Sequence, residues 1–565
     1  MRLLSLSLGL SCLKYVVTTV QIPLKTAFAE TDTISASDSK WTDLTARPDA
    51  NGTSQFIFDN VNAMLQHWTH TRYRNGHSII PATVPVGTLL YHGRGDTELP
   101  THPEWTAIDP EHSFPFCGAW NGNDTSNMCW QLTLVTTRPL KVLYFDGSSA
   151  AKVVGGGTLD TQDLLVWGKV DPERRRDEWG RINALCAWGR DFGIDGFVRE
   201  IMLCDFSQGV ELASADNLAT WWTNRTTPPF WRPPLESHPP PRSSAESLYS
   251  LDDDDPFFPA GDIFRFETVR AGSWHNHYPG ETRIKLDLTG FISFYDTALT
   301  PSLVFTRQGT ERWDHRLAGI SPADLEAVKS RLSDVLTRGP HSVGSGVDWR
   351  TLYRVRLELL DYLLNTTTPH NANVRARQIQ TQLRVMLTPY ILYTSRPPPR
   401  ASVDLAATGN DPWAWALPVW HGCATRHTAH IHASASLQSR LTPSERLLLR
   451  ALDETNREIC RVVVRIWVAG VHAGLDTLIP LEDTQIATDP LLVVEAWRPE
   501  AAALMKWLDW GVWTKCRPAC EIEEICYLPT WPYFWGGQNR PDPTDDRWKR
   551  PQPRCIRQVA PYSGL

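Results

Sequence analysis

The chain has 565 residues, of which 42% are hydrophobic, and a formal net charge of −7 at pH 7. This length corresponds to about two to four domains of ordinary size, each able to bury its own core. The negative balance argues against nucleic-acid binding, which requires a basic face, so we expect no nucleic-acid partner.

The N-terminus has the organisation of a secretory leader. Met1 and Arg2 precede an apolar run from Leu3 to Leu13, and Ala27-Phe28-Ala29 fits the small-x-small cleavage pattern. We therefore expect a signal peptide over residues 1–29 and a secreted, extracellular protein. A signal anchor and an ordinary amphipathic segment are the alternatives. No later stretch offers the ~20 apolar residues of a spanning helix, so no further transmembrane segment is expected.

Cysteine usage agrees with secretion. Of the 11 cysteines, Cys12 lies in the expected leader, and the ten that follow are an even number. Four sequons, at Asn51, Asn123, Asn224 and Asn365, predict a glycoprotein.

Residues 55–225 alternate helix and strand patterns, and we predict an α+β domain with a mixed sheet there. The predicted elements are a helix over Phe56 to His67, a turn and buried strand over Thr83 to Tyr91, strands from Trp130 to Phe145 divided at Pro139, a helix from Arg174 to Trp188, and one strand from Phe197 to Phe206.

A proline-rich and acidic stretch over residues 226–262 interrupts this pattern. Its composition cannot bury a core, which predicts a linker or an insertion. Strand-like sequence resumes within residues 263–300, at Phe264 to Val269 and Arg283 to Tyr295. If these strands complete the first sheet, residues 226–262 are an insertion.

The rest of the chain, residues 301–515, is predicted to be mainly helical. Ser321 and Thr442 each precede a proline and an early acid, which is the pattern of a capped helix start, and Asp348 starts another helix. The helix after Thr442 should run to about Ala473. In the tail, residues 516–565, Cys516, Cys520, Cys526 and Cys555 are expected to form local disulfides. The fold class is therefore α+β, with an N-terminal sheet domain, a helical C-terminal half and a Cys-rich tail.

Three short segments carry the sharpest chemical pattern. They are Leu90-Tyr91-His92-Gly93, the stretch from Trp105 to Ser113, and Glu200-Ile-Met-Leu-Cys-Asp205. In this order they resemble the His, aromatic and Glu segments of the ADP-ribosyltransferase fold in its His-Tyr-Glu class, over about residues 80–210. The whole chain also resembles an uncharacterised group of large secreted fungal proteins, a likeness that implies no activity.

The first resemblance implies NAD as substrate, in an ADP-ribosyltransferase or an NAD glycohydrolase. Glu200 and His92 would be the catalytic residues, the carboxylate stabilising positive charge on the ribose and the imidazole binding ribose hydroxyls. The implied cofactor-binding residues are Tyr91, Gly93, Trp105 and Ser113, with Trp105 stacking on nicotinamide. Two positions depart from that family: Trp105 replaces the usual Tyr, and Arg94 follows His-Gly where a small residue is usual.

Structural roles are the alternative for the same residues. His92 would be a hydrogen-bonded strand residue, Trp105 a core anchor and Glu200 an exposed acid at a strand end. The protein would then be a non-enzymatic surface or interaction protein, with glycans or cell-surface proteins as partners. Its 25 tryptophans provide material for a glycan-stacking surface. Whether the chain is an enzyme is left open at this stage.

A weaker candidate site is a metal centre built from His427, His430 and His432. Their spacing places pairs on one face of a strand or helix. The alternative is that they are ordinary polar residues in a loop.

Overall fold

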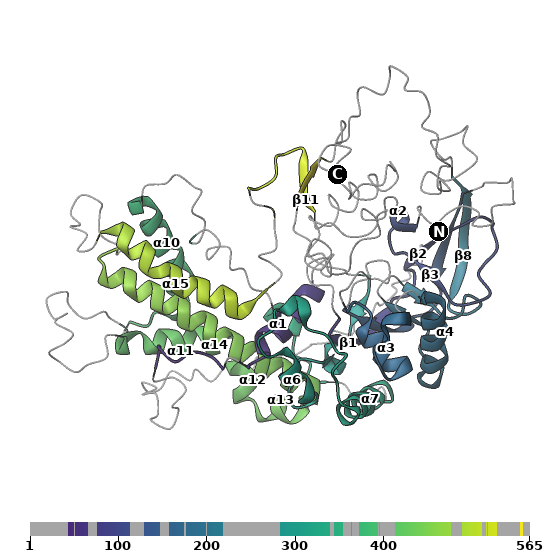
Figure 1. Ribbon diagram of the computed structural model, residues 1–565, viewed down its shortest axis with the longest axis horizontal. Helices are drawn as coiled ribbons and strands as arrows, with labels where there is room; N and C mark the ends of the chain where they lie inside the picture. The colour runs from purple at the N-terminus through teal and green to yellow at the C-terminus, as the bar shows by residue number, and fades with distance from the viewer. Residues whose placement is uncertain are drawn as a thin grey trace, which may run out of the picture.

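The structure is a computed structural model with an α+β fold. Sheets flanked by α3 and α4 form one half, long helices form the other, and α1 lies at the junction (Figure 1). The structure describes residues 43–49, 51–65, 76–113, 129–146, 157–174, 177–198, 201–218, 283–338, 344–353, 363, 372–393, 395, 413–475, 489–510, 516, 518–527 and 554–557. The expected leader, the 226–262 stretch and the expected strand over Phe264 to Val269 lie outside these residues.

The strands form two larger sheets and a C-terminal hairpin. They are β1 (Ser78–Val84), β2 (Leu89–Arg94), β3 (Glu104–Thr106), β4 (Trp130–Thr136), β5 (Leu140–Phe145), β6 (Gly196–Val198), β7 (Ile201–Leu203), β8 (Val210–Asn217), β9 (Lys285–Leu286), β10 (Ile292–Ser293), β11 (Glu524–Tyr527) and β12 (Arg554–Arg557).

The larger sheet has the order β10-β1-β5-β6-β7-β3, with β9 also paired to β1. Only the β5–β6 pair within it is parallel, so the sheet is mixed. The second sheet has the order β2-β4-β8, and β11 pairs with β12. The late strands β9 and β10 therefore complete the first sheet, as the sequence allowed, and Pro139 separates β4 from β5 as expected.

One predicted strand was wrong. The stretch from Phe197 to Phe206 is not a single strand but two, β6 and β7, which pair with each other in antiparallel register with Val198 opposite Ile201. Two buried strands can be joined by only two polar turn residues. So short an interruption of an apolar run does not reveal that the chain reverses.

Alternation along the central strands buries the larger sheet on both faces. Val142, Val198 and Leu203 belong to one core cluster, shared with β2 and β4. Their neighbours in sequence belong to a second cluster against α3, α4 and α7; these are Leu143, Phe197 and Met202. Because successive strand residues point to opposite faces, this pattern fixes the register of β5, β6 and β7.

The helices are α1 (Ser54–Met64), α2 (Pro110–Ser113), α3 (Asp160–Trp167), α4 (Glu178–Gly189), α6 (Ser302–Arg307), α7 (Pro322–Leu336), α8 (Trp349–Leu352), α10 (Ala372–Leu387), α11 (Leu417–Thr425), α12 (Ala429–Ala433), α13 (Ala435–Arg440), α14 (Pro443–His472) and α15 (Pro490–Leu508). Among the described residues, no helix has the length and apolar character needed to cross a membrane.

The predicted caps are confirmed. Ser321 accepts a hydrogen bond from the Asp324 N–H at the start of α7. Thr442 and Glu445 form a reciprocal capping box at the start of α14. The fully buried Glu445 carboxylate also accepts bonds from the Ser345 N–H and the Trp349 indole, both at 3.1 Å. These bonds, led by that of the Ser345 side chain, hold its pKa below the usual range despite burial.

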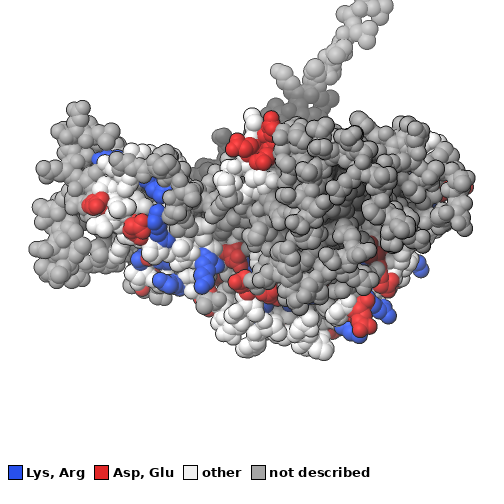
Figure 2. All heavy atoms as spheres, turned by 45° about the horizontal axis from the view of Figure 1, so that its top comes forward, with Lys and Arg blue, Asp and Glu red and all other residues white. Residues whose placement is uncertain are grey.

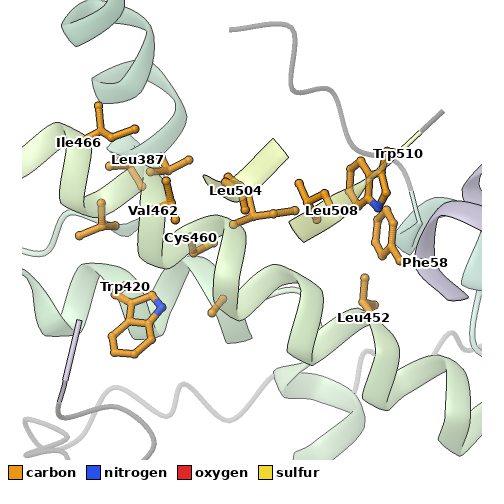
Figure 3. Close-up of a cluster of buried hydrophobic side chains, with 14 of the residues drawn as sticks. Phe58, Leu387, Trp420, Leu452, Cys460, Val462, Ile466, Leu504, Leu508 and Trp510 are labelled. Atoms are coloured by element: carbon orange, nitrogen blue, oxygen red, sulfur yellow. The ribbon is translucent and has the colours of Figure 1, made fainter. Parts of the chain in front are cut away.

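The first helix packs into the core of the helical half. Phe58 of α1 stacks on Trp510, which follows α15, with ring centroids 4.9 Å apart (Figure 3). Phe58 also contacts Tyr353, and the Trp510 indole donates to the Gln55 carbonyl at 2.9 Å. Segments from both ends of the chain therefore share one core.

A buried polar cluster joins the two halves beside this core. Arg312, only 3% exposed, contacts three groups from both ends of the chain. Its Nη1 donates to Asp59 at 2.6 Å and to the Asp509 carbonyl at 2.9 Å, and its Nη2 donates to Asn60 at 2.7 Å. The cluster satisfies a charge that would otherwise be costly to bury.

Disulfides link neighbouring elements. Three are fully described: Cys186–Cys204, Cys423–Cys460 and Cys520–Cys555. Cys129 and Cys516 are also disulfide-bonded, so all eight cysteines whose side chains the structure describes are oxidised. The Cys520–Cys555 bond lies within the tail, as expected for that pair.

Charged side chains of both signs occur over the described residues of the face shown in Figure 2. Lys and Arg side chains lie among Asp and Glu side chains there, which is the usual composition of a solvated surface.

The buried Asp146 gives a stability prediction. Its Oδ1 accepts the backbone N–H groups of His77 and Ser78, each at 2.7 Å, and burial raises its pKa from the usual 3.8 to about 6. Asp146→Ala should lower the free energy of unfolding by about 2–4 kcal/mol, because two buried donors lose their acceptor. Asp146→Asn keeps an acceptor oxygen without a charge and should cost less.

The pH dependence of stability separates the effect of losing the acceptor oxygen from the effect of losing the charge. Because the folded pKa of Asp146 lies above the unfolded value, its contribution is full below pH 3.8 and is lost as pH rises through about 6. The stability of the unmodified protein relative to Asp146→Asn should therefore fall between pH 4 and pH 6, measured by urea unfolding. A constant difference across that range would contradict the assignment.

The disulfides give a second prediction. Mass spectrometry under non-reducing conditions should find most of the ten cysteines after residue 29 paired, including Cys186–Cys204. Removing that bond with Cys186→Ala and Cys204→Ala together should cost about 3 kcal/mol, because it frees a loop with a sequence separation of 18 residues. Free thiols at most positions would overturn the pairing.

Candidate functional site

The three segments singled out in the sequence lie on neighbouring strands. His92 is on β2, and Trp105 is on β3. β2 contacts β3 through a single bridge in which Tyr91 and Ala107 exchange both backbone hydrogen bonds, at 2.8 and 2.7 Å. β3 in turn pairs with β7, with Trp105 opposite Met202. The spatial order is therefore β2, β3, β7.

His92 is held at the point where β2 and β3 separate. Its Nδ1 lies 2.8 Å from the Trp105 carbonyl oxygen. A carbonyl only accepts, so Nδ1 carries the proton and Nε2 has a free lone pair. If β2 and β3 continued to pair beyond Tyr91, the Trp105 carbonyl would accept the Gly93 N–H. The His92 side chain takes that position instead.

Burial keeps the His92 ring neutral. Desolvation lowers its pKa from 6.5 to about 4, outweighing the opposite effect of the bond to Trp105. On the same side, the ring lies 6.2 Å from the Phe206 ring. His92 is thus a neutral imidazole with a fixed tautomer at pH 7.

The Trp105 indole faces a different neighbour. It packs edge-on against Trp179 at the start of α4, with ring centroids 5.2 Å apart, and borders the core between the sheet and the helices. His92 and Trp105 therefore meet through a backbone carbonyl, while their rings contact different elements.

Ser113 and Gly93 are linked through Gln131. The Gln131 side-chain nitrogen donates to the Ser113 hydroxyl and to the Pro110 carbonyl, both at 2.8 Å. Gln131 is also the register partner of Gly93 in the β2–β4 pair. The structure thus brings Tyr91, His92, Gly93, Trp105 and Ser113 into one region. Glu200 lies outside the described residues, and the chain resumes at Ile201, the first residue of β7, opposite Thr106.

Ionised groups surround this region. Arg94 and Asp96 form an ion pair at 2.6 Å, and His102 lies 3.5 Å from Glu104. Burial raises the pKa of the Glu104 carboxyl, and the Trp105 N–H and His102 oppose this shift. Sequence reasoning did not single out either pair, because each is a local contact around a short loop.

Two of the three candidate metal-binding histidines bond different partners. His427 hydrogen-bonds the Tyr390 hydroxyl at 2.8 Å, and His432 bonds Asp453 at 2.7 Å. His430 lies between them on α12. Among the described residues, the group with ligand spacing is instead Cys516, Cys520 and Cys555, whose sulfurs are in disulfides.

A cleft next to the three strands was not predicted from the sequence. It has a volume of about 960 Å³ and is lined by the loop before β3, by α4 and by the segment after β7. Phe206 belongs to its lining and also contacts His92. Its residues come from four separate stretches of chain, and no local pattern marks them as one site.

The His92 bond gives a testable prediction. His92→Ala should lower the free energy of unfolding by about 1–3 kcal/mol, because the Trp105 carbonyl loses its donor. His92→Asn places an amide donor at a similar position and should cost less. The comparison is made by urea unfolding at pH 7.

Acid sensitivity provides the control. The folded pKa of about 4 lies below the unfolded value of 6.5, so the His92 contribution is full above pH 6.5 and is lost as pH falls through about 4. The stability of the unmodified protein relative to His92→Asn should fall over that range. An unchanged difference would mean that His92 is already solvated.

Comparisons with known proteins place relatives on this part of the chain. Residues 38–128 and 118–229 match the family model of the YPL277C N-terminal domain. The uncharacterized protein YPL277C of Saccharomyces cerevisiae is 31% identical over 209 residues, covering 28% of this chain and 42% of that protein. The uncharacterized protein YOR389W of the same yeast is 32% identical over 209 residues, covering 28% of this chain and 33% of its own length.

The matches thus span less than half the length of either relative. No solved structure matches the chain. The family model covers β1 to β8, the three strand segments and every residue that lines the cleft. The N-terminal region of this chain is similar to an uncharacterised group of fungal proteins.

Proposed function

We propose that the N-terminal region binds NAD and cleaves its glycosidic bond, as an ADP-ribosyltransferase or an NAD glycohydrolase. The observation that carries this proposal is that β3 lies between the other two segments: it pairs with β7, and Ala107 next to it bridges to Tyr91 of β2. The His92 segment, the Trp105 segment and the strand that follows Glu200 therefore lie near one another, although the first and last are about 100 residues apart in sequence.

His92 supplies an acceptor in this proposal. Its Nδ1–H is committed to the Trp105 carbonyl, so Nε2 accepts a hydrogen bond from a ribose hydroxyl. The low pKa keeps this nitrogen unprotonated at neutral pH. The fixed ring orientation reduces the entropy lost when the ribose is positioned.

Glu200 supplies the charge. Departure of nicotinamide leaves positive charge on the ribose, and a carboxylate aimed at that carbon stabilises the transition state more than the ground state. Support comes from register: Glu200 precedes Ile201, which pairs with Thr106 next to Trp105.

Secretion belongs to the same proposal. All eight cysteines whose side chains the structure describes are in disulfides, and such bonds persist in oxidising compartments. The N-terminal leader pattern and the sequons add support from the sequence.

The test combines NAD binding with turnover. Titration calorimetry of the full chain should detect NAD binding, and nicotinamide release should fall by at least about 100-fold in Glu200→Gln, which removes charge without changing volume. Glu211→Gln, an exposed carboxyl on β8, is the matched control and should retain full turnover.

Trp105→Ala tests the indole separately. The bond to His92 comes from the backbone carbonyl, so this variant keeps it, and weaker NAD binding would report the indole ring itself. Unchanged turnover in Glu200→Gln would assign any activity to another group. Absence of NAD binding by the unmodified protein would favour the competing expectation, a non-enzymatic interaction protein.

A further inference from the structure

The cleft beside α4 has the shape and lining of a small-ligand site. Its volume of about 960 Å³ is within the range of sites that enclose much of a bound ligand. We propose that it binds a neutral oligosaccharide. This site borders the region proposed for NAD, through Trp105 and Phe206, but the proposal does not depend on NAD chemistry.

One wall is a single face of α4. Residues at helical spacing lie along one side of this helix. They are Trp179, Asn183, Cys186, Ala187 and, at the C-cap, Arg190. The last four line the cleft, and Trp179 continues the same face beyond it. From Trp179 to Arg190 this face extends about 16 Å, long enough for several sugar rings.

An exposed aromatic surface lies at the Trp179 end. Trp179 is 48% exposed, although the Trp105 ring packs against it in a T-shaped arrangement and the His102 ring lies 5.3 Å away. Asn183 donates to the Trp179 carbonyl at 2.8 Å and steadies this turn of the helix. An aromatic side chain that is about half exposed beside a cleft can stack on the apolar C–H face of a sugar ring.

Both apolar and polar side chains line the cleft. The polar ones carry hydroxyl, amide, carboxylate and guanidinium groups, which can donate to and accept from sugar hydroxyls. They belong to Thr101, Asn183, Arg190, Asp205, Ser207 and Gln208.

Two of the three basic side chains that line the cleft, Arg138 and Lys141, already have partners, and the third is Arg190. Arg138 forms two hydrogen bonds with Asp195, at 2.8 and 2.6 Å. The Lys141 ammonium donates to the carbonyls of Phe192 and Leu336. The C-terminal end of α4, which carries partial negative charge, also lies at this wall. These partners and the helix C-terminus disfavour a phosphate or sulfate, whereas a neutral hydroxyl-rich ligand meets both donors and acceptors.

A disulfide fixes the distance between two walls. Cys186 is on α4, and Cys204 begins the segment that forms the opposite wall. In that segment Asp205 accepts the Ser207 N–H at 2.8 Å and the Ser207 hydroxyl at 2.6 Å, which holds the turn. A preformed site loses less entropy on binding a flexible glycan.

The experiment uses the full oxidised chain with defined probes. Calorimetric titrations are run with hexasaccharides of glucose, mannose and N-acetylglucosamine, and with a sulfated hexasaccharide as the anionic comparison. At least one neutral probe should bind saturably. Trp179→Ala should weaken that binding by about tenfold through lost stacking. Phe305→Ala, which removes an aromatic ring that is 79% exposed on α6, is the matched control and should bind normally.

Asn183→Ala and unfolding curves complete the test. Asn183→Ala should also weaken binding, while both cleft variants keep the unfolding midpoint within a few degrees of the unmodified protein. The proposal is overturned if no neutral probe binds at millimolar concentration, if only the sulfated probe binds, or if Trp179→Ala binds as tightly as Phe305→Ala. If Trp179→Ala fails to fold, Trp179→Phe and Asn183→Ala decide the question by the same criteria.

Discussion

Arg312 makes the interaction on which the arrangement of the two halves depends. Its guanidinium is buried where the sheet region, the first helix and the end of the last helix meet, and it bonds Asp59, Asn60 and the Asp509 carbonyl. Loss of one member of such a buried pair leaves an uncompensated charge and typically costs about 3–5 kcal/mol.

The position of Asp509 is equally constrained, since its φ of +43° ends α15 in the left-handed region. Asp tolerates this conformation better than most residues do.

Local sequence features predicted much of the fold. Helix caps and a proline break each act on only the few residues around them. The structure has the helix starts expected from Thr442 with Glu445 and from Ser321 with Pro322, and the strand break expected at Pro139. The reversal after Val198 was missed because only two polar residues, Arg199 and Glu200, interrupt the apolar run there. Membership of α1 in the helical core was missed for a different reason. Periodicity predicts an apolar face but not which distant face covers it.

In the candidate site, too, the strand segments could be predicted from local sequence, whereas the long-range contacts could not. The three segments were predicted to form strands near one another, and the structure pairs β3 with β7 and bridges Ala107, next to β3, to Tyr91 of β2. Sequence patterns could not reveal that His92 bonds a backbone carbonyl or that the Trp105 ring turns to Trp179. The cleft was invisible because its lining combines a loop, a helix face and a turn joined by the Cys186–Cys204 bond. Such a site exists only once the long-range contacts have formed.

The shared core of α1 and α15 has a consequence for how the chain folds. Gln55 and Trp510 are 455 residues apart in sequence, and Ser54 bonds Glu454 across 400 residues. During synthesis the apolar face of α1 cannot complete its native contacts until nearly the whole chain has emerged. Contacts of such high sequence separation form late, so the sheet half can assemble before α1 docks against α15. The final docking step should therefore be slow, and a nascent chain would need protection of this helix against aggregation until α15 arrives.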